Sequence, residues 1–254
     1  MKPPSVAVIL ITRDRPVLLA DALGSVTTQT SAPLEVRIAD DGDDPAAEVV
    51  AGAGLLEVTV VDVDVRNPAA ARNRAAAGAR ADVLAFLDDD DRWRPTHLEG
   101  LQRAFADPEC GLAYRDCLVV KEQVIEGGKR VDLERRPIAR DWTPAIMAEN
   151  DYVPPSAFAV RRSWFERLGG FDESFSCSED WDFLLRAARL GTPRRVPGVT
   201  VEIRMREHGQ ASRDMGPGRR AALDLLSARH GLPRLEIKTF WEVAADVGVS
   251  EESA

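Results

Sequence analysis

Phe86-Leu87-Asp88-Asp89-Asp90-Asp91 places four consecutive carboxylates directly after an apolar run that begins at Val83. An apolar run of this length is typical of a buried strand, so the acids stand at the carboxyl end of that strand. In an open α/β sheet, ligands bind at that end of the strands. Adjacent negative charges repel one another, and a shared cation relieves the repulsion.

Carboxylate oxygens suit Mg²⁺ or Mn²⁺, and such an ion bridges protein carboxylates to substrate phosphates. The acidic run therefore predicts a metal–phosphate site. The alternative is a solvated acidic turn before a helix that begins near Pro95.

The composition is that of a globular protein with an acidic balance. The 254 residues suit one or two domains, and 44% hydrophobic with 30% charged residues is ordinary for such a chain. The net charge of −9 argues against a nucleic-acid partner, which would select a basic face. It does not argue against nucleotides, because a bound metal ion reverses the local charge.

The cysteines and the N-terminal residues predict a cytoplasmic enzyme. Cys110, Cys117 and Cys177 are an odd number without metal-type spacing, which favours free thiols in a reducing compartment. Residues 1–5 lack the apolar stretch of a signal peptide, and no run approaches the ~18 apolar residues of a membrane span. Peripheral association with a membrane stays open.

Apolar runs alternate with helical patterns in the first half of the chain. Residues 5–11 predict a buried strand, and Asp14 and Pro16 after it mark the start of a helix with Asp14 as a candidate cap. Residues 57–65 alternate apolar and acidic side chains, which favours a strand near a sheet edge. The other predicted strands are 34–39 and 83–87, and helices are predicted near 45–51 and at 69–80. This alternation predicts a parallel sheet with right-handed crossovers.

The second half predicts a more mixed set of elements. Glu126 to Lys129 has the pattern of a hairpin turn, Thr143-Pro144 opens a short helix, and Ser178 is a candidate cap. The predicted strands are 112–120, 156–161 and a segment near 195–203, and the predicted helices are 162–168, 179–190 and a segment near 217–229.

Polar residues follow two other predicted strands. Asp40-Asp41-Gly42 stands at a strand end and is either a tight turn or a ligand site, where a carboxylate could accept hydrogen bonds from a base or a ribose hydroxyl. Thr12 closes the first strand at the same rim. Arg72, near the start of its helix, is either a solvated arginine or a group that reaches a base or phosphate.

Two later segments carry candidate site residues. Glu179, Asp180 and Asp182 stand in a first helical turn, where the helix dipole alone favours acids, but a carboxylate there could also act as general base toward a hydroxyl. The sequence leaves open which of the three would do so. Arg206 and His208 lie among cations that suit a diphosphate, and the alternative for His208 is a structural or exposed residue.

Taken in order, these motifs resemble the family 2 glycosyltransferases with the GT-A fold. The resemblance covers about residues 5–208, and six motifs in the right order make it specific. The motifs are Val-Ala-Val-Ile-Leu-Ile-Thr-Arg-Asp-Arg-Pro, Ala-Asp-Asp-Gly, Ala-Arg-Asn, Phe-Leu-Asp-Asp-Asp-Asp, Gly-Gly-Phe-Asp-Glu and Glu-Asp-Trp-Asp.

The resemblance implies one fused GT-A-type α/β domain. It would have a Rossmann-like, mostly parallel central sheet with helices on both faces and a smaller mixed sheet on the acceptor side. Residues 1–110 would form the half that binds the nucleotide sugar, and residues 111–254 the half that binds the acceptor and carries the catalytic base. The enzyme would be inverting and metal-dependent, with a hydroxyl-bearing acceptor that is a saccharide, a lipid-linked saccharide or a small molecule.

The resemblance also implies roles for individual residues. Asp180 would be the general base, and Asp90 would ligate Mg²⁺ or Mn²⁺ at the diphosphate, together with His208. Asp88 would contact the ribose or donor sugar. The remaining donor-binding residues would be Thr12, Asp14, Asp40, Arg72, Asp89 and Arg206, the last of these in a late loop that closes over the diphosphate.

Two positions depart from the family pattern. The family often has Asn where this chain has Asp14, and an acid at that position alters contacts to the base. The family also often has Gly near position 68, where Pro68 makes the backbone of this chain stiffer. Neither departure touches the metal or base positions. The chain lacks the membrane segments of processive polysaccharide synthases, which favours transfer of a single residue.

Other functions are less favoured by the sequence. A nucleotidyltransferase also uses acidic metal sites but usually has a Gly-rich loop after its first strand, and residues 12–16 contain no glycine. A catalytically inactive nucleotide-sugar-binding protein remains an alternative, although both Asp90 and Asp180 are present. A Rossmann dehydrogenase is disfavoured because no Gly-x-Gly-x-x-Gly follows the first strand.

Overall fold

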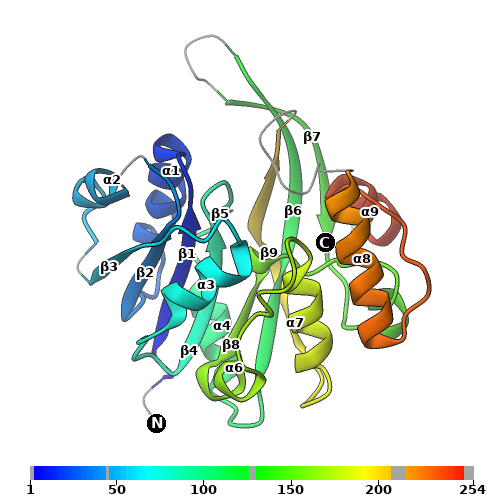
Figure 1. The fold of residues 1–254 in the computed structure, drawn as a ribbon. Coiled ribbons are helices and arrows are strands. Elements are labelled where there is room, and N and C mark those ends of the chain that lie inside the picture. Colours follow the sequence, from blue (N-terminus) through cyan, green and yellow to red (C-terminus); the bar gives the residue numbers. More distant parts are fainter. Residues whose placement is uncertain (1–2, 44–45, 56, 126–129, 207–215, 249–254) are drawn as a thin grey trace.

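A single mixed sheet runs through the protein, with helices packed against it (Figure 1). The computed structural model describes residues 3–43, 46–55, 57–125, 130–206 and 216–248. Within these residues the sheet has nine strands in the order β3-β2-β1-β4-β8-β6-β9-β5, and β7 pairs with β6 outside that path.

The first half of the chain forms the parallel part of the sheet, as the sequence predicts. Its strands are β1 (Val6–Thr12), β2 (Glu35–Asp40), β3 (Val58–Asp62) and β4 (Val83–Asp88). Its helices are α1 (Pro16–Thr27), α2 (Ala46–Gly52) and α3 (Pro68–Ala76). The strand β3 lies at the edge, which accounts for its alternating acidic pattern.

The strand order places the binding crevice. The chain moves outward from β1 through β2 to β3 and then returns to β4 on the other side of β1. With right-handed crossovers, this reversal puts α3 on the opposite face from α1 and α2. The reversal occurs between β1 and β4, and ligands bind at the carboxyl ends of strands at such a switch point. Thr12 and Asp88 end those two strands.

The second half continues the same sheet with mixed strand directions. The strand β8 (Phe158–Arg161) is antiparallel to β4, and β6 (Leu112–Val124) is antiparallel to β8 and parallel to β9 (Arg194–Met205). The strand β5 (Arg92–Trp93) pairs with β9, and β7 (Arg130–Ile138) pairs antiparallel with β6. The mixed strands expected on the acceptor side are therefore continuous with the parallel strands.

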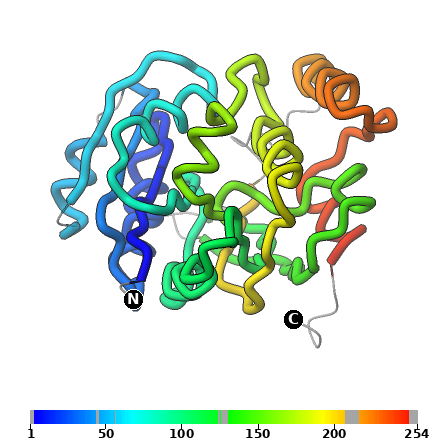
Figure 2. Tube along the Cα trace, turned by 90° about the horizontal axis from the view of Figure 1, so that it is seen from below, coloured from blue at the N-terminus to red at the C-terminus, as the bar shows by residue number. Residues whose placement is uncertain are grey.

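The remaining helices surround the mixed strands. The helix α4 (His97–Phe105) contacts β6 and β9, α6 (Arg162–Leu168) packs on β8, and α7 (Glu179–Ala187) lies between α3 and α6. The other elements are α5 (Pro144–Met147), the short 3₁₀ helix η2 (Pro155–Ala157), α8 (Pro217–His230) and α9 (Phe240–Val247). In Figure 2 the N-terminal strands and α8 lie at opposite sides of the molecule, with α7 between them.

Buried phenylalanines fix α7 against the sheet. The Phe171 ring lies 5.1 Å from the ring of Phe86 on β4 and 4.8 Å from the ring of Phe183 on α7. All three side chains are essentially inaccessible. Each such ring contributes about 1.5–3 kcal/mol when it is buried. This packing brings the acidic first turn of α7 to the same crevice as the acidic end of β4.

Several local predictions need correction. Asp14 does not cap α1, because it has a left-handed backbone (φ 52°) and its Oδ1 accepts a hydrogen bond from the backbone N–H of Asp43. Ser178 precedes α7, but its side chain makes no capping hydrogen bond. The helix α3 ends at Ala76 and α7 at Ala187, earlier than predicted. Residues 126–129, where a hairpin turn is predicted, lie outside the described residues.

The sequence analysis missed α9. Its signal was present, because the Thr239 side chain accepts from the backbone of Glu242 and the Glu242 side chain accepts from the backbone of Thr239, a capping box. The helix has only eight residues, so its periodic pattern is short.

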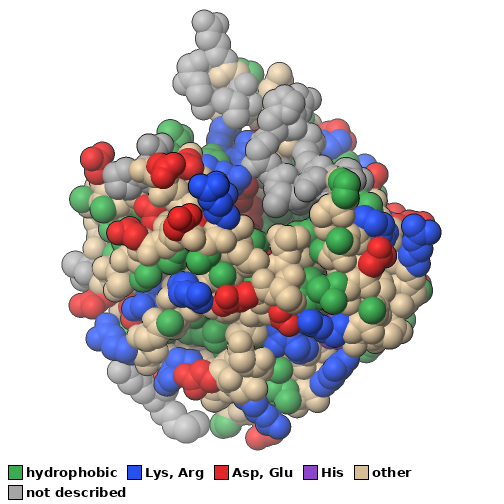
Figure 3. Space-filling view, in the orientation of Figure 1, with side chains coloured by type: hydrophobic (Ala, Val, Ile, Leu, Met, Phe, Trp, Pro, Cys, Tyr) green, Lys and Arg blue, Asp and Glu red, His purple; other side chains and the backbone are tan. Residues whose placement is uncertain are grey.

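The surface carries charges of both signs. Figure 3 shows Lys and Arg side chains interspersed with Asp and Glu over one face, which is not the continuous basic face that nucleic acid selects. No helix in the described part of the chain is both long and apolar enough to cross a membrane.

Candidate active site

A cavity of about 400 Å³ lies at the carboxyl ends of β1 and β4. Its walls come from both halves of the chain: the ends of β1 and β4, the start of α3, the loop at 149–155, the start of α7, the end of β9, and the helices α8 and α9. The tertiary structure therefore brings the acidic run and the first turn of α7 to one cavity, although about 90 residues separate them.

The four acids after β4 have different surroundings. Asp89 and Asp91 are 4% and 5% exposed, whereas the side chains of Asp88 and Asp90 keep 24% and 15% of their surface exposed. Asp91 accepts hydrogen bonds from the Ser156 hydroxyl (2.6 Å) and from a backbone N–H on β9. The buried Asp89 and Asp91 hold the turn in place, whereas the more exposed Asp88 and Asp90 are available to a ligand.

Thr12 and Asp89 contact each other. The Thr12 hydroxyl donates to Asp89 Oδ2 at 2.8 Å, and Arg15 Nη1 donates to Asp89 Oδ1 at 3.1 Å. Burial and the neighbouring charge of Asp90 raise the pKa of Asp89 to about 6, against the opposing effect of Arg15. Both residues line the cavity, but they are also partners of each other across the switch point.

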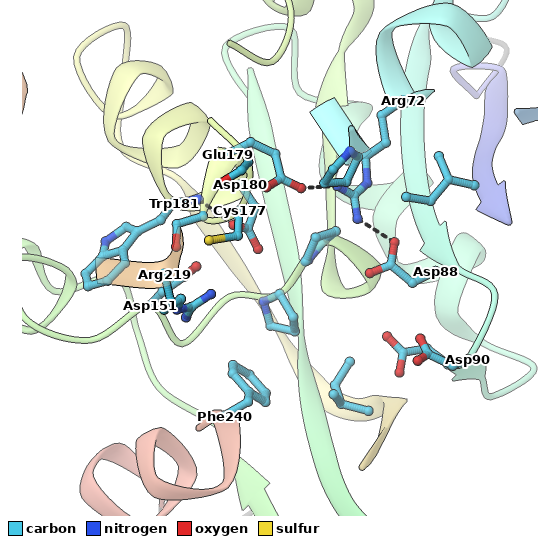
Figure 4. Close-up of a pocket in the computed structure, with 18 of the residues that line it drawn as sticks. Arg72, Asp88, Asp90, Asp151, Cys177, Glu179, Asp180, Trp181, Arg219 and Phe240 are labelled. Carbon is cyan, nitrogen blue, oxygen red and sulfur yellow. Dashed lines mark hydrogen bonds and ion pairs between the residues drawn. The ribbon is translucent and has the colours of Figure 1, made fainter. Parts of the chain in front are cut away.

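Arg72 lies buried between the two acidic segments. It is 4% exposed and donates to Asp88 Oδ1 at 2.5 Å and to Glu179 Oε1, so it links α3 to both β4 and α7 (Figure 4). Burial alone lowers the pKa of Arg72, but the charges of Asp88 and Glu179 more than offset this and raise it above its usual value. The predicted alternative of a solvated arginine is wrong.

The two acids at the end of β2, Asp40 and Asp41, have different surroundings, which the sequence could not show. Asp40 is 4% exposed, and its Oδ2 accepts from the backbone N–H of Ala46 at the start of α2 (2.7 Å). Asp41, not Asp40, is among the residues that line the cavity, and its Oδ1 accepts from the backbone N–H of Val65 at 2.7 Å. Asp14 lies beside this turn and is also outside the cavity lining.

The three acids of α7 are separated by their partners. Glu179 is bound to Arg72, and Asp182 is fully buried and accepts from Arg186 Nε (2.7 Å) and contacts His230 Nε2 (2.8 Å) on α8. Asp180 alone is both partly exposed and part of the cavity lining. Its Oδ1 accepts from the backbone N–H of Trp181 at 2.9 Å.

Burial raises the pKa of Asp180, and the nearby charge of Asp88 adds to the effect. The charges of Arg72 and Arg219 and the Trp181 hydrogen bond act in the opposite direction. A partly buried carboxylate with a raised pKa is suited to accept a proton from a hydroxyl.

The donor set at the acidic run fits a divalent ion that is shared with a substrate. Mg²⁺ and Mn²⁺ commonly take one or two protein carboxylates and complete their coordination with phosphate oxygens and water. Asp90 offers such a carboxylate, although here its Oδ2 contacts Arg206 Nη2 at 2.7 Å. The described residues contain no group of three or more His, Cys, Asp or Glu arranged to hold a metal ion by themselves. His208 lies outside the described residues.

Residues that the sequence analysis did not single out also line the cavity. Asp151 comes from the loop before η2, Arg219 from α8, and Phe240 from the first turn of α9 (Figure 4). Lys238 comes from the segment just before α9. No motif marked them, because each is a single residue in a different segment. Only the folded chain brings them together.

Comparisons with known proteins agree with this architecture. The model of "Glycosyl transferase family 2" matches residues 7–169, and that of "Glycosyltransferase like family 2" matches residues 112–245. The "Uncharacterized glycosyltransferase YwdF" of Bacillus subtilis is 29% identical over 237 residues, which cover 92% of this chain and 87% of that protein. The "Pre-mycofactocin glycosyltransferase" of Mycobacterium tuberculosis is 28% identical, with 54% of this chain and 29% of that protein covered.

Solved structures are similar in fold at low sequence identity. TarS residues 1–349 of S. aureus, in complex with UDP-GlcNAc, superposes with a TM-score of 0.70 at 18% identity and covers 96% of this chain and 71% of that one. The mannosyltransferase PcManGT of Pyrobaculum calidifontis, in complex with GDP-Man and Mn²⁺, has a TM-score of 0.58 at 21% identity. The match covers 85% of this chain and 59% of that one. These likenesses confirm the predicted fold class. Because the first family model spans well over half of the chain, the protein belongs to glycosyl transferase family 2 and is a glycosyltransferase with a GT-A-type fold.

Proposed function

We propose that this protein transfers a sugar from a nucleoside-diphosphate sugar to an acceptor hydroxyl with inversion at the anomeric carbon, in a metal-dependent reaction. One observation carries the proposal: the part-exposed Asp88 and Asp90 and the part-exposed Asp180 line the same cavity from different elements (Figure 4). A diphosphate at the first pair and an acceptor at Asp180 would place nucleophile and leaving group on opposite sides of the sugar.

The reaction would proceed in one displacement. Asp180 takes the proton of the acceptor hydroxyl as its oxygen forms a bond to the anomeric carbon, and the bond from that carbon to the diphosphate oxygen breaks. The bonding electrons leave with the nucleoside diphosphate. A divalent ion, when bound, would stabilise the charge that develops on the leaving diphosphate.

Similar proteins support the donor class. The TarS structure contains UDP-GlcNAc, and the PcManGT structure contains GDP-Man with Mn²⁺. Asp41, Arg72 and Asp88 line the cavity and would contact the nucleoside. Asp14 and Asp40 do not line the cavity; they accept hydrogen bonds from the backbone N–H groups of Asp43 and Ala46, and so would hold the turn that carries Asp41. Arg206 donates to Asp90 in this structure, and it would exchange this ion pair for a contact with the diphosphate when the donor binds. The cytoplasmic location stays a prediction, consistent with three free cysteines.

The direct test is turnover of a panel of UDP-, GDP- and dTDP-sugars with Mn²⁺, measured as release of the nucleoside diphosphate. We expect one nucleotide class to be turned over. A nucleotidyltransferase would release pyrophosphate, and an inactive binding protein would release neither product. Calorimetric titration of UDP, GDP and dTDP, with and without Mn²⁺, would identify the preferred base.

Replacement of Asp90 tests the metal role. We expect Asp90→Asn to remove the increase in nucleotide affinity that Mn²⁺ produces, a loss of about tenfold or more, because the amide lacks the charge that a hard cation requires. Asp64→Asn is the matched control, since the Asp64 side chain is 90% exposed on a loop outside the cavity. Equal Mn²⁺ dependence in Asp90→Asn and the control would contradict the assignment.

The raised pKa of Asp180 predicts the pH dependence of transfer. Only the deprotonated carboxylate can take a proton, so kcat at saturating donor and Mn²⁺ should rise with pH. The midpoint of this rise should lie above the ordinary aspartate value of about 3.9. A pH–rate profile from pH 4 to 9 measures it, and a kcat that stays flat or falls between pH 4 and 7 would argue against Asp180 as the base.

A further inference from the structure

The loop between α5 and η2 places one more carboxyl group in the cavity. Asp151 stands beside Asn150, whose Oδ1 accepts from Lys238 Nζ at 3.0 Å, and beside Tyr152, which is 2% exposed and donates to the backbone carbonyl of Asp141 at 3.1 Å. Its neighbours on both sides are therefore anchored. The Asp151 side chain lines the cavity and lies close to Asp180 and Arg219 in Figure 4.

The Asp151 carboxyl group is incompletely paired. Its Oδ1 is buried and has no hydrogen-bond partner among the residues that the structure describes. Buried polar atoms in native proteins are nearly always hydrogen-bonded, and an unpaired one costs free energy. An oxygen of this kind in a cavity wall is suited to a partner that a ligand supplies.

Charged groups from several elements face Asp151. Burial raises its pKa, and the charges of Asp180 and Glu179 on α7 add to this, whereas the Val153 backbone N–H and Arg219 on α8 act against it. A carboxyl group can accept a hydrogen bond from a hydroxyl, and in its protonated form it can also donate one.

The chemistry around Asp151 selects the class of ligand. Among the described residues that line the cavity from position 149 onward, the acidic side chains outnumber the basic ones; the acids are Glu149, Asp151, Glu179, Asp180 and Glu236, and the bases are Arg219 and Lys238. A negatively charged acceptor would be repelled by this excess. Apolar side chains such as Phe240 and Val243 complete the wall, and a pocket with an apolar wall and a few polar groups orients a neutral polar ligand.

We propose that Asp151 is an acceptor-binding residue that holds a second hydroxyl group of the acceptor, next to the hydroxyl that Asp180 deprotonates. The acceptor is therefore an uncharged saccharide with neighbouring hydroxyl groups, and not a phosphate-bearing compound or a simple alcohol. This inference rests on the proposed function. Asp151 forms and breaks no covalent bond and takes no proton from the nucleophile; it orients the ring.

The experiment compares matched acceptors, with the donor that the wild-type enzyme turns over. The acceptors are the methyl glycosides of glucose, galactose, mannose and N-acetylglucosamine, their 6-phosphates, and deoxy analogues that lack the hydroxyl next to the site of transfer. The enzymes are wild type, Asp151→Leu, Asp151→Asn and the control Asp141→Asn. Asp141 stands ten residues earlier and has a side chain that is 85% exposed. The quantity measured is the ratio of kcat/KM between each glycoside and its deoxy analogue.

We expect wild type to transfer to at least one neutral glycoside and to prefer it to its 6-phosphate. Loss of the neighbouring hydroxyl should lower wild-type kcat/KM by roughly 5- to 150-fold, the range for one buried hydrogen bond. In Asp151→Leu this ratio should fall to near 1, while Asp151→Asn keeps part of it because an amide can still donate and accept. Asp141→Asn should discriminate like wild type.

Three results would overturn the inference: discrimination in Asp151→Leu equal to that of wild type, preference for the 6-phosphates, or donor hydrolysis by wild type without transfer to any neutral glycoside. The last two would leave the proposed function standing. If Asp151→Leu fails to fold, Asp151→Asn takes its place, and full wild-type discrimination in Asp151→Asn would then overturn the inference. A wild-type enzyme that releases no nucleoside diphosphate at all would refute the proposed function and this inference with it.

Discussion

Asp180→Asn should lower kcat for transfer by about 10²- to 10⁴-fold, the usual contribution of a positioned general base. The amide has the shape of the carboxylate but cannot take the proton of the acceptor hydroxyl. Nucleotide affinity should change little, because the side chain is on the α7 side of the cavity, away from Asp88 and Asp90 (Figure 4). The measurements are steady-state turnover of the donor and calorimetric titration of the nucleoside diphosphate with Mn²⁺.

The control for this change is Glu173→Gln. The Glu173 side chain is 44% exposed, precedes α7 and lies outside the cavity lining.

The neighbouring variant Asp182→Asn should mainly reduce stability, because the Asp182 side chain is buried against Arg186 and His230. If Asp180→Asn weakened nucleotide binding as much as it slowed transfer, Asp180 would be a donor-binding residue and not the base.

Arg72→Met should lower the free energy of unfolding by about 3–5 kcal/mol, the cost of breaking a buried ion pair on one side. The loss leaves Glu179 buried without its cation, and Asp88 loses the same partner. Methionine fills much of the space but cannot compensate either charge. Urea denaturation monitored by circular dichroism measures the effect, and donor turnover should also fall because β4 and α7 are no longer joined.

Arg74→Met, two residues further along α3, provides the matched control. Its side chain is 49% exposed and pairs with the 44% exposed Glu173, and exposed pairs of this kind contribute about 0–1 kcal/mol. Similar small losses in both variants would mean that Arg72 is not a structural link between the two acidic segments.

Much of the fold could be predicted from local patterns. The strands β1, β2 and β4 are continuous apolar runs, and the position of β3 at the edge follows from its alternating acids. Patterns of this kind report on the backbone and on burial, which are set by residues close in the sequence. The failed caps at Asp14 and Ser178 show the limit, because a hydrogen bond to a distant segment or a left-handed backbone overrides a cap preference.

Asp40 and Asp41 illustrate the same limit within the site. Both stand in one short motif, yet Asp40 is used at the start of α2 and Asp41 is the one that lines the cavity. Adjacent side chains on a strand point to opposite sides, and the turn that follows decides which of them faces a ligand. The motif could predict that the turn is polar, but not which carboxylate is available.

The sequence by itself determined the parallel half of the sheet, the order of the motifs, the family, and the two acidic segments as candidates for the chemistry. The tertiary structure alone decided that Arg72 joins these segments, and that Asp180 is the only one of the three α7 acids that is both part-exposed and part of the cavity lining. It also decided that Asp151, Arg219 and Phe240 line the same cavity. The physical reason is distance along the chain: backbone preference and apolar periodicity are local, whereas the pairing, burial and raised pKa of a carboxyl group depend on residues that meet it only in the folded protein.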